Sequence, residues 1–312
     1  MTVPVIEFVG AVKQYGNKTI GPMDFSASRG EILGFLGPNG SGKTTCIRML
    51  LGLSRPSSGR VRLRGVDPLR NHVEALTGVG YSAELPNIQT FLTPREVTKL
   101  AAAEMGLRDP TPEVYRVLEE VGIIEYADTK VGKLSKGMVQ RLSVALALLG
   151  SPEVMVLDEP MIGLDPAGTA HLREVLRKYA KDGGTILMSS HMMSEVEDLC
   201  SSVILIHSGR LLYMGTPKGM VEEMLGANIV RVQAKGLTPE LVESIRRTSG
   251  VIDVVESEGW LEVRVGQGVE ARPTIARLVS DSGAELLTMT GGERMLERAY
   301  IEALRSGRDE SK

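Results

Sequence analysis

Short apolar runs recur through the first two thirds of the chain, and helix-like stretches separate them. The clearest runs lie within residues 30–37, 153–160, 184–191 and 201–209. Because these runs contain few alternating polar positions, they are typical of parallel strands that are buried on both faces of a sheet. The first run leads into a glycine-rich turn and then a helical pattern over residues 43–53. The pattern therefore predicts an α/β core.

Two other patterns precede and interrupt this core. Residues 3–12 and 19–28 are rich in β-forming residues and predict strands near the start of the chain. From about residue 85 to residue 155 the pattern is helical, with Thr-Pro pairs at Thr93 and Thr111 that each have a Glu in the first turn. The simplest interpretation is a helical insert inside the α/β core.

The pattern changes again beyond residue 225. Segments with strand and helix patterns follow one another there in the order βαββαβ, which is typical of a ferredoxin-like domain. A last helical segment, residues 292–304, carries an apolar stripe and is expected to pack against another part of the protein. The stripe consists of Met295, Leu296, Ala299, Tyr300 and Leu304. We therefore predict two domains, residues 1–225 and residues 226–312.

Composition limits the partners and the compartment. A net charge of −3 gives no general attraction to nucleic acid, so no nucleic-acid partner is expected. Cys46 and Cys200 lie in predicted helices without metal-ligand spacing, which favours a reducing cytosolic compartment. The apolar stretches are far shorter than the roughly 20 residues that span a bilayer, and the N-terminus lacks the pattern of a signal peptide. We expect a protein that neither crosses a membrane nor enters a secretory pathway.

The glycine-rich turn matches the complete pattern of a phosphate-binding loop and has the required strand and helix on either side. Its residues are Gly37, Pro38, Asn39, Gly40, Ser41, Gly42, Lys43 and Thr44. The glycines allow backbone N–H groups to converge on phosphate oxygens, and the start of the helix adds a positive end. We expect Lys43 to reach the outer phosphates and the Thr44 hydroxyl to bind Mg²⁺.

Two adjacent carboxylates, Asp158 and Glu159, follow the apolar run at residues 154–157. Buried carboxylates are costly unless they serve a cation or a proton transfer. Successive strand residues point to opposite faces of a sheet, so the two are expected to have different roles. Asp158 is expected to hold Mg²⁺ through water, and Glu159 to polarise the water that attacks the phosphate. The alternative is an ordinary acidic turn after a strand.

Two further residues each have two interpretations. His191 follows a predicted strand at the edge where ligands bind in open α/β sheets. It contacts a γ-phosphate or satisfies a loop carbonyl, and the neighbouring motifs favour the phosphate. Tyr15 stacks on a nucleotide base or belongs to the core, and a lone aromatic residue more often belongs to the core.

These motifs, in this order, resemble those of the nucleotide-binding subunits of ATP-binding cassette (ABC) transporters over about residues 4–225. The resemblance also rests on a Leu-Ser-Lys-Gly-Met signature at residues 134–138 and a Gly-Leu-Asp-Pro turn at residues 163–166. It implies an ABC-type P-loop fold with a parallel core sheet, an antiparallel β subdomain and a helical insert. It also implies ATP and Mg²⁺ as ligands. The nucleotide-binding residues that it adds are Tyr15, Thr45 and Asp165.

In this family two such domains stack head to tail, and the signature of one chain closes over the ATP of the other. The resemblance therefore implies that Ser135 and the amides near Gly137 bind the γ-phosphate of ATP held by a second ABC subunit. A homodimer is expected, because this chain has one phosphate loop and one signature. An ordinary helix-capping role for Ser135 is the alternative.

Two departures from the family pattern point to one of its branches. Lys136 and Met138 replace the third and fifth residues of the usual Leu-Ser-Gly-Gly-Gln signature. The loop that commonly carries a glutamine has Glu84, which is able to bind Mg²⁺ or its water but has no hydrogen-bond donor. Together with the C-terminal extension, these departures resemble the ABC-2 type exporters, whose ATPase subunits serve separate membrane proteins.

We therefore expect a cytoplasmic ATPase, peripheral on the cytoplasmic face of the cell membrane, that energises an integral membrane permease. One alternative is an importer subunit whose C-terminal domain senses a small molecule. A second alternative is a soluble, non-transport cassette ATPase that acts on ribosomes or DNA. Such proteins usually carry two cassettes in one chain or long coiled coils, and neither is visible in this sequence.

Overall fold

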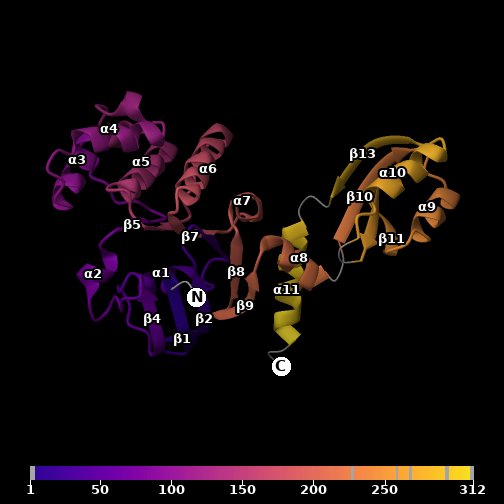
Figure 1. The fold of residues 1–312 in the computed structure, drawn as a ribbon, viewed down its shortest axis with the longest axis horizontal. Helices are drawn as coiled ribbons and strands as arrows, with labels where there is room; N and C mark the ends of the chain where they lie inside the picture. Colours follow the sequence, from indigo (N-terminus) through magenta and orange to yellow (C-terminus); the bar gives the residue numbers. More distant parts are fainter. Residues whose placement is uncertain (1–3, 226–227, 258, 267–268, 292–294, 310–312) are drawn as a thin grey trace. The chain divides into compact units, whose positions relative to one another are not determined.

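The computed structural model describes residues 4–225, 228–257, 259–266, 269–291 and 295–309 (Figure 1). The chain divides into two compact units, Met1–Met214 and Gly215–Lys312. Each unit contains a hydrophobic core of its own. Among the described residues, no helix has both the length and the apolar character needed to cross a bilayer.

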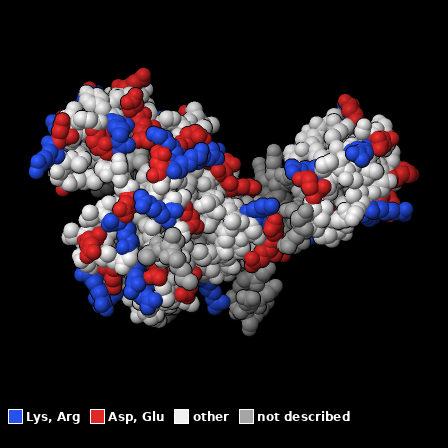
Figure 2. Space-filling view, viewed as in Figure 1, with Lys and Arg blue, Asp and Glu red and all other residues white. Residues whose placement is uncertain are grey.

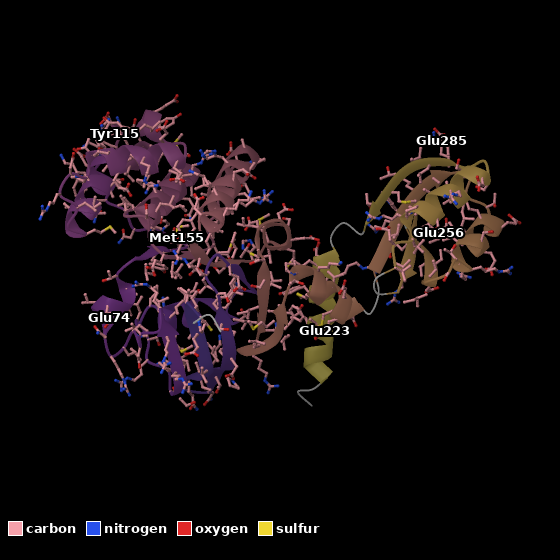
Figure 3. The ribbon with its side chains drawn as sticks, in the orientation of Figure 1. Glu74, Tyr115, Met155, Glu223, Glu256 and Glu285 are labelled. Atoms are coloured by element: carbon pink, nitrogen blue, oxygen red, sulfur yellow. The ribbon has the colours of Figure 1, made fainter. Side chains whose placement is uncertain are left out.

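A six-stranded sheet in the first unit confirms the α/β core. Its strands lie in the order β5-β6-β7-β3-β8-β9. Their bounds are Ile32–Leu36 (β3), Val79–Ser82 (β5), Val154–Asp158 (β6), Thr185–Ser190 (β7), Ser202–His207 (β8) and Arg210–Gly215 (β9). Every residue of β3, β6 and β7 is buried, including Met155, which Figure 3 labels in β6. This burial explains why apolar runs mark these strands in the sequence.

Strand β7 pairs in parallel with both β3 and β6. The carboxyl ends of these strands therefore lie at one edge of the sheet. The phosphate loop follows β3, the two carboxylates end β6, and His191 follows β7. Topology thus gathers at this edge three motifs that are far apart in the sequence.

A smaller antiparallel sheet, in the order β2-β1-β4, completes this core as expected. Its bounds are Ile6–Tyr15 (β1), Lys18–Ala27 (β2) and Ser58–Leu63 (β4). Phe25 of β2 stacks on Phe8 of β1, with 4.3 Å between ring centroids, and meets Phe35 of β3 edge-on at 5.5 Å. The three rings join the two sheets through one apolar core.

Helices α3, α4 and α5 form the expected helical insert and group together in Figure 1. The helices of the first unit are Lys43–Leu50 (α1), His72–Leu76 (α2), Pro94–Glu104 (α3), Thr111–Glu120 (α4), Lys136–Leu148 (α5), Pro166–Lys181 (α6) and Met193–Leu199 (α7), with short 3-10 turns at Ile124–Tyr126 and Val131–Lys133. Thr93 caps α3 through a capping box with Glu96. Helix α4 instead begins at Thr111 itself, so the second Thr-Pro pair lies inside the first turn.

The second unit contains an antiparallel sheet in the order β11-β12-β10-β13, as in the ferredoxin-like arrangement that the sequence predicts. Helices α9 and α10 pack against this sheet around a core that includes Val232, Ile245 and Ile275. The elements are Pro217–Leu225 (α8), Asn228–Lys235 (β10), Pro239–Arg246 (α9), Val251–Ser257 (β11), Trp260–Val265 (β12), Arg272–Asp281 (α10), Glu285–Gly291 (β13) and Met295–Asp309 (α11).

The last helix, α11, packs against α8 within the second unit (Figure 1). Leu296 and Ala299 of the predicted stripe are buried on α11, as is Met220 on α8. The side chain of Met295 lies outside the described residues. This contact places α8 in the second unit, whereas we expected the domain boundary after residue 225.

Isolated residues 215–312 are expected to unfold cooperatively on heating and not to bind ATP, because they have a core of their own and no phosphate loop. A matched fragment, residues 226–312, lacks α8 and leaves the apolar stripe of α11 uncovered. Its Tm should be lower, by about 4–8 °C for each kcal/mol lost. Circular dichroism and fluorescent-nucleotide titration measure both properties. A broad, non-cooperative transition of the longer fragment would contradict the expectation.

Candidate active site

The phosphate loop between β3 and α1 requires glycine at two positions. Gly37 and Gly42 have φ angles of 155° and 125°. A Cβ atom on Gly37 would lie 2.1 Å from the carbonyl oxygen of Ile206, and one on Gly42 would lie 2.9 Å from Ile20. The loop is therefore enclosed by neighbouring strands, and its amides precede the positive end of α1.

A cavity of about 230 Å³ lies over this loop. It gathers eleven of the predicted residues, which are Pro38, Asn39, Gly40, Ser41, Gly42, Lys43, Thr44, Thr45, Glu84, Asp158 and Glu159. Lys18 and Ile20 of β2 also line it, and the sequence analysis did not assign either to the site. The cavity lining does not include Gly37, Tyr15, Ser135, Gly137, Asp165 or His191.

Lys43 is buried at the base of this cavity. Its Nζ donates a hydrogen bond to the carbonyl oxygen of Gly37 at 2.6 Å and lies 4.0 Å from Glu159 Oε1. Burial lowers the pKa of Lys43, and the charges of Glu159, Asp158 and Glu84 act in the opposite direction. A buried ammonium group with so few solvent contacts is well placed to interact strongly with an anion.

The cavity contains oxygen atoms of the kind that a hard cation prefers. Thr44 Oγ1 donates a hydrogen bond to Asp158 Oδ2 at 3.4 Å, and Glu84 lies on the same cavity. Ser41 Oγ is buried without a hydrogen-bond partner among the described residues. Such a hydroxyl is costly to bury unless it binds another group. The residues therefore fit a nucleotide phosphate together with a magnesium ion.

Ser189 of β7 holds the side chain of Asp158 and the backbone of Glu159 at the end of β6. Its hydroxyl donates to Asp158 Oδ1 at 2.5 Å and accepts a hydrogen bond from the backbone N–H of Glu159 at 2.9 Å. Glu159 has a φ of 51°, in the left-handed region that few non-glycine residues adopt. Strained backbone of this kind is concentrated at functional sites. Both carboxylates line the same cavity but have different contacts, because Asp158 accepts a hydrogen bond from Thr44 and Glu159 meets His191.

His191 hydrogen-bonds Glu159 directly. The distance between His191 Nδ1 and Glu159 Oε2 is 2.7 Å, and the backbone N–H of His191 lies 3.4 Å from the same oxygen. The histidine ring thus contacts a carboxylate, and neither of our two interpretations included this contact. Its side chain is 51% exposed, so the ring also remains open to a ligand.

Ser135 and Asp165 are both helix N-caps. Ser135 Oγ accepts a hydrogen bond from the N–H of Met138 at 3.2 Å at the start of α5, and Asp165 Oδ1 accepts one from Gly168 at 2.8 Å at the start of α6. A Cβ atom on Gly137 would lie 2.9 Å from the carbonyl oxygen of Gly163, so the signature packs closely on the Gly-Leu-Asp-Pro turn. Ser135 and Asp165 are both exposed, so both are accessible to another molecule.

Tyr15 lies at the end of β1 and is 45% exposed, so it does not belong to the core. Lys13 Nζ lies 5.1 Å from the centroid of its ring. The Tyr15 hydroxyl is 3.4 Å from Ser54 Oγ. Lys13 therefore lies over the ring, and the exposed part of the ring is accessible to a flat ligand.

A phosphate loop between a parallel strand and a helix, with an Asp-Glu pair on a nearby strand, defines a P-loop nucleoside triphosphatase. The first unit matches the ABC transporter family over residues 20–162. The bacitracin transport ATP-binding protein BcrA of Bacillus licheniformis is 34% identical over 312 residues, covering 97% of this chain and 98% of that protein. The chain belongs to the ABC transporter family and is an ATP-hydrolysing subunit of the exporter type.

Two further comparisons agree with this conclusion. The Nod factor export ATP-binding protein I of Burkholderia orbicola (strain AU 1054) is 37% identical over 235 residues, covering 74% of this chain and 77% of that protein. A solved ATP-binding subunit of an ABC transporter has a TM-score of 0.66 and 28% identity, covering 71% of this chain and 93% of the other. The fold class and the function expected from the sequence are thereby confirmed. Subunits of this family dimerise and work with a membrane permease.

Proposed function

We propose that two copies of this chain bind two MgATP molecules between them and that each site combines the phosphate loop of one copy with the signature of the other. The observation that carries this proposal is the division of the motifs between two places. Lys43 and Glu159 line the cavity, whereas Ser135, Gly137 and Asp165 do not. Ser135 also lies at the N-terminus of α5, where the helix dipole favours an anion.

In this proposal, three groups of residues are assigned to the phosphates, the base and the magnesium ion. The amides of residues 37–42 and Lys43 bind the phosphates, and Tyr15 stacks on the base. Thr44, Asp158 and Glu84 hold Mg²⁺ directly or through water. When bound, the ion neutralises charge on the outer phosphates.

Hydrolysis itself depends on Glu159, which polarises the attacking water by accepting a hydrogen bond from it. His191 is hydrogen-bonded to this carboxylate and is assigned the contact with the γ-phosphate. Water attacks the γ-phosphorus and ADP leaves, while Lys43 and the partner's signature helix stabilise the charge on the transferred phosphoryl group. Lys43 and Glu159 are already held by buried neighbours, whereas His191 and the partner's signature take up their contacts when ATP binds.

ATP hydrolysis by this chain energises an integral membrane permease in this proposal. We place the chain at the cytoplasmic face of the cell membrane. Both relatives named above are transport ATP-binding proteins, one for bacitracin and one for Nod factor. Positive and negative side chains are interspersed on the face of the first unit shown in Figure 2, with no broad basic surface for nucleic acid there.

Affinity purification of the chain from detergent-solubilised membranes tests this partner. We expect a protein with several apolar spans to co-purify and to increase the ATP turnover of the chain when both are placed in lipid. The matched control is the Lys43→Ala chain, which should recover the same partner without turnover. Recovery of ribosomes or DNA in place of a membrane protein would contradict the proposal.

Lys18 is expected to supply a second positive charge to the phosphates. Its Nζ lies 2.7 Å from the carbonyl oxygen of Gly40 and lines the cavity. Replacing Lys18 with Met should weaken ATP binding about tenfold, or about 1.4 kcal/mol, because a charge-assisted contact is lost. Adenosine binding should change little, because adenosine carries no phosphate. The control is Lys99→Met, an exposed lysine on α3. Titration with fluorescent nucleotide measures both, and equal losses for ATP and adenosine would exclude a phosphate contact.

A further inference from the structure

Glu195 of α7 is a buried carboxylate that the proposed reaction does not use. Only 4% of its surface is exposed, whereas Glu197 on the same helix is exposed. Burial raises the pKa of Glu195, the bond from Ser190 opposes that rise, and the charge of Glu159 adds to it. Burying a carboxylate costs free energy unless hydrogen bonds offset the loss of water. The hydrogen bonds of Glu195 therefore indicate its role.

The principal contact of Glu195 is with Ser190, the last residue of β7. The Ser190 hydroxyl donates a hydrogen bond to Glu195 Oε2 at 2.6 Å and accepts one from the backbone N–H of Met192 at 3.0 Å. A serine hydroxyl has one proton and two lone pairs, so it can make both bonds at once. The residues on either side of His191 are thereby connected through one buried oxygen.

The neighbouring serine has a complementary contact. Ser189 bonds Asp158 and the N–H of Glu159, on the other side of the strand. Successive strand residues point to opposite faces, so the two hydroxyls attach the end of β7 to β6 on one side and to α7 on the other. His191 follows directly, and its ring meets Glu159 at 2.7 Å.

We propose that Ser190 and Glu195 are positioning residues for ATP hydrolysis, which hold the turn at residues 190–192 so that His191 stays aligned with Glu159 and with the γ-phosphate. This inference rests on the role of His191 in the proposed function. Neither residue touches the nucleotide cavity, so their effect on the reaction passes through His191. A shift of about 1 Å in an aligned group is enough to slow a reaction about a hundredfold.

Four variants test the inference by steady-state ATP hydrolysis. Ser190→Ala and Glu195→Ala should lower kcat about tenfold to a hundredfold while the Kd for ATP stays within about twofold of wild type. Glu195→Gln should recover most of kcat, because its amide oxygen still accepts the Ser190 bond. Glu197→Ala, on the exposed face of α7, should match wild type. The Tm of each variant shows that it is folded, and Ser190→Ala removes only one oxygen.

A double variant separates this inference from the function on which it rests. If Ser190 acts through His191, then His191→Ala/Ser190→Ala should be no slower than His191→Ala alone. Independent losses that multiply in the double variant would overturn the inference, as would wild-type kcat in Ser190→Ala. Wild-type kcat in His191→Ala would instead overturn the proposed role of the histidine.

Discussion

Replacing Glu159 with Gln is expected to lower ATP turnover by about two to four orders of magnitude while ATP affinity changes by less than about threefold. The amide keeps the size of the side chain but has lost the basic carboxylate that polarises water. The phosphate loop and Lys43 are unchanged in this variant, so binding persists. If hydrolysis opens the proposed dimer, the ATP-bound dimer should consequently accumulate.

Single-turnover hydrolysis and size-exclusion chromatography with ATP measure the two effects. Glu153→Gln is the matched control, because Glu153 lies next to the other end of β6 and pairs with Arg64 away from the cavity. It should hydrolyse ATP at the wild-type rate. Turnover near wild type in Glu159→Gln would show that Glu159 does not take part in the chemical step. If the Glu159→Gln chain stayed monomeric in the presence of ATP, the expected accumulation of the dimer would be contradicted.

The Lys43→Ala and Ser135→Arg chains are each expected to lose at least about two orders of magnitude in turnover when assayed alone. Lys43→Ala removes the buried cation of the cavity, so each of the two sites lacks its phosphate contact. Ser135→Arg places a long side chain at the start of α5, where the proposal locates the partner's γ-phosphate. Every site of either homodimer therefore lacks one essential part.

Loss of the helix cap is a separate effect of Ser135→Arg and needs its own control. Thr93→Ala removes the equivalent cap of α3, which lies outside the cavity, and should cost about 1 kcal/mol of stability without lowering turnover. If Thr93→Ala were as inactive as Ser135→Arg, lost capping would be a sufficient explanation. ATP hydrolysis and thermal unfolding of both variants make this comparison.

The sequence predicts the core sheet and the phosphate loop because strong local constraints mark them. Strands buried on both faces must be apolar throughout, as β6 is from Val154 to Leu157. At Gly37 and Gly42 a side chain would collide with neighbouring strands. The apolar strand and the glycine-rich loop each lie within a few consecutive residues. Both can therefore be recognised in the sequence without knowledge of the tertiary structure.

Lys18, Ser189 and Glu195 could not be predicted in the same way. Each is a single polar residue that belongs to no recognisable motif. Its role depends on a contact with a residue elsewhere in the fold, namely Gly40, Asp158 and Ser190 respectively. Lys18 reaches the phosphate loop because Ile20, two residues further along β2, is buried against Gly42 of that loop. The bond between His191 and Glu159 likewise exists only because β6 and β7 are adjacent.

The boundary between the two units likewise depends on a tertiary contact that the sequence pattern does not show. The pattern of α8 resembles that of any amphipathic helix, and nothing local indicates which core it joins. Its contact with α11, beyond the ferredoxin-like sheet in the sequence, assigns it to the second unit. Two helices about 70 residues apart in the sequence leave no local hydrophobic pattern that shows their contact.

Mixing the Lys43→Ala and Ser135→Arg chains tests the shared site most directly. In a mixed dimer the intact phosphate loop of the Ser135→Arg chain faces the intact signature of the Lys43→Ala chain, which rebuilds one complete site while the other site is doubly impaired. The measurement is steady-state ATP hydrolysis against the mixing ratio, with cross-linking to confirm that mixed dimers form. We predict a maximum near equal amounts, where the mixed dimer reaches about half of the population if the chains pair at random, and a flat line at background would contradict a site shared between two chains.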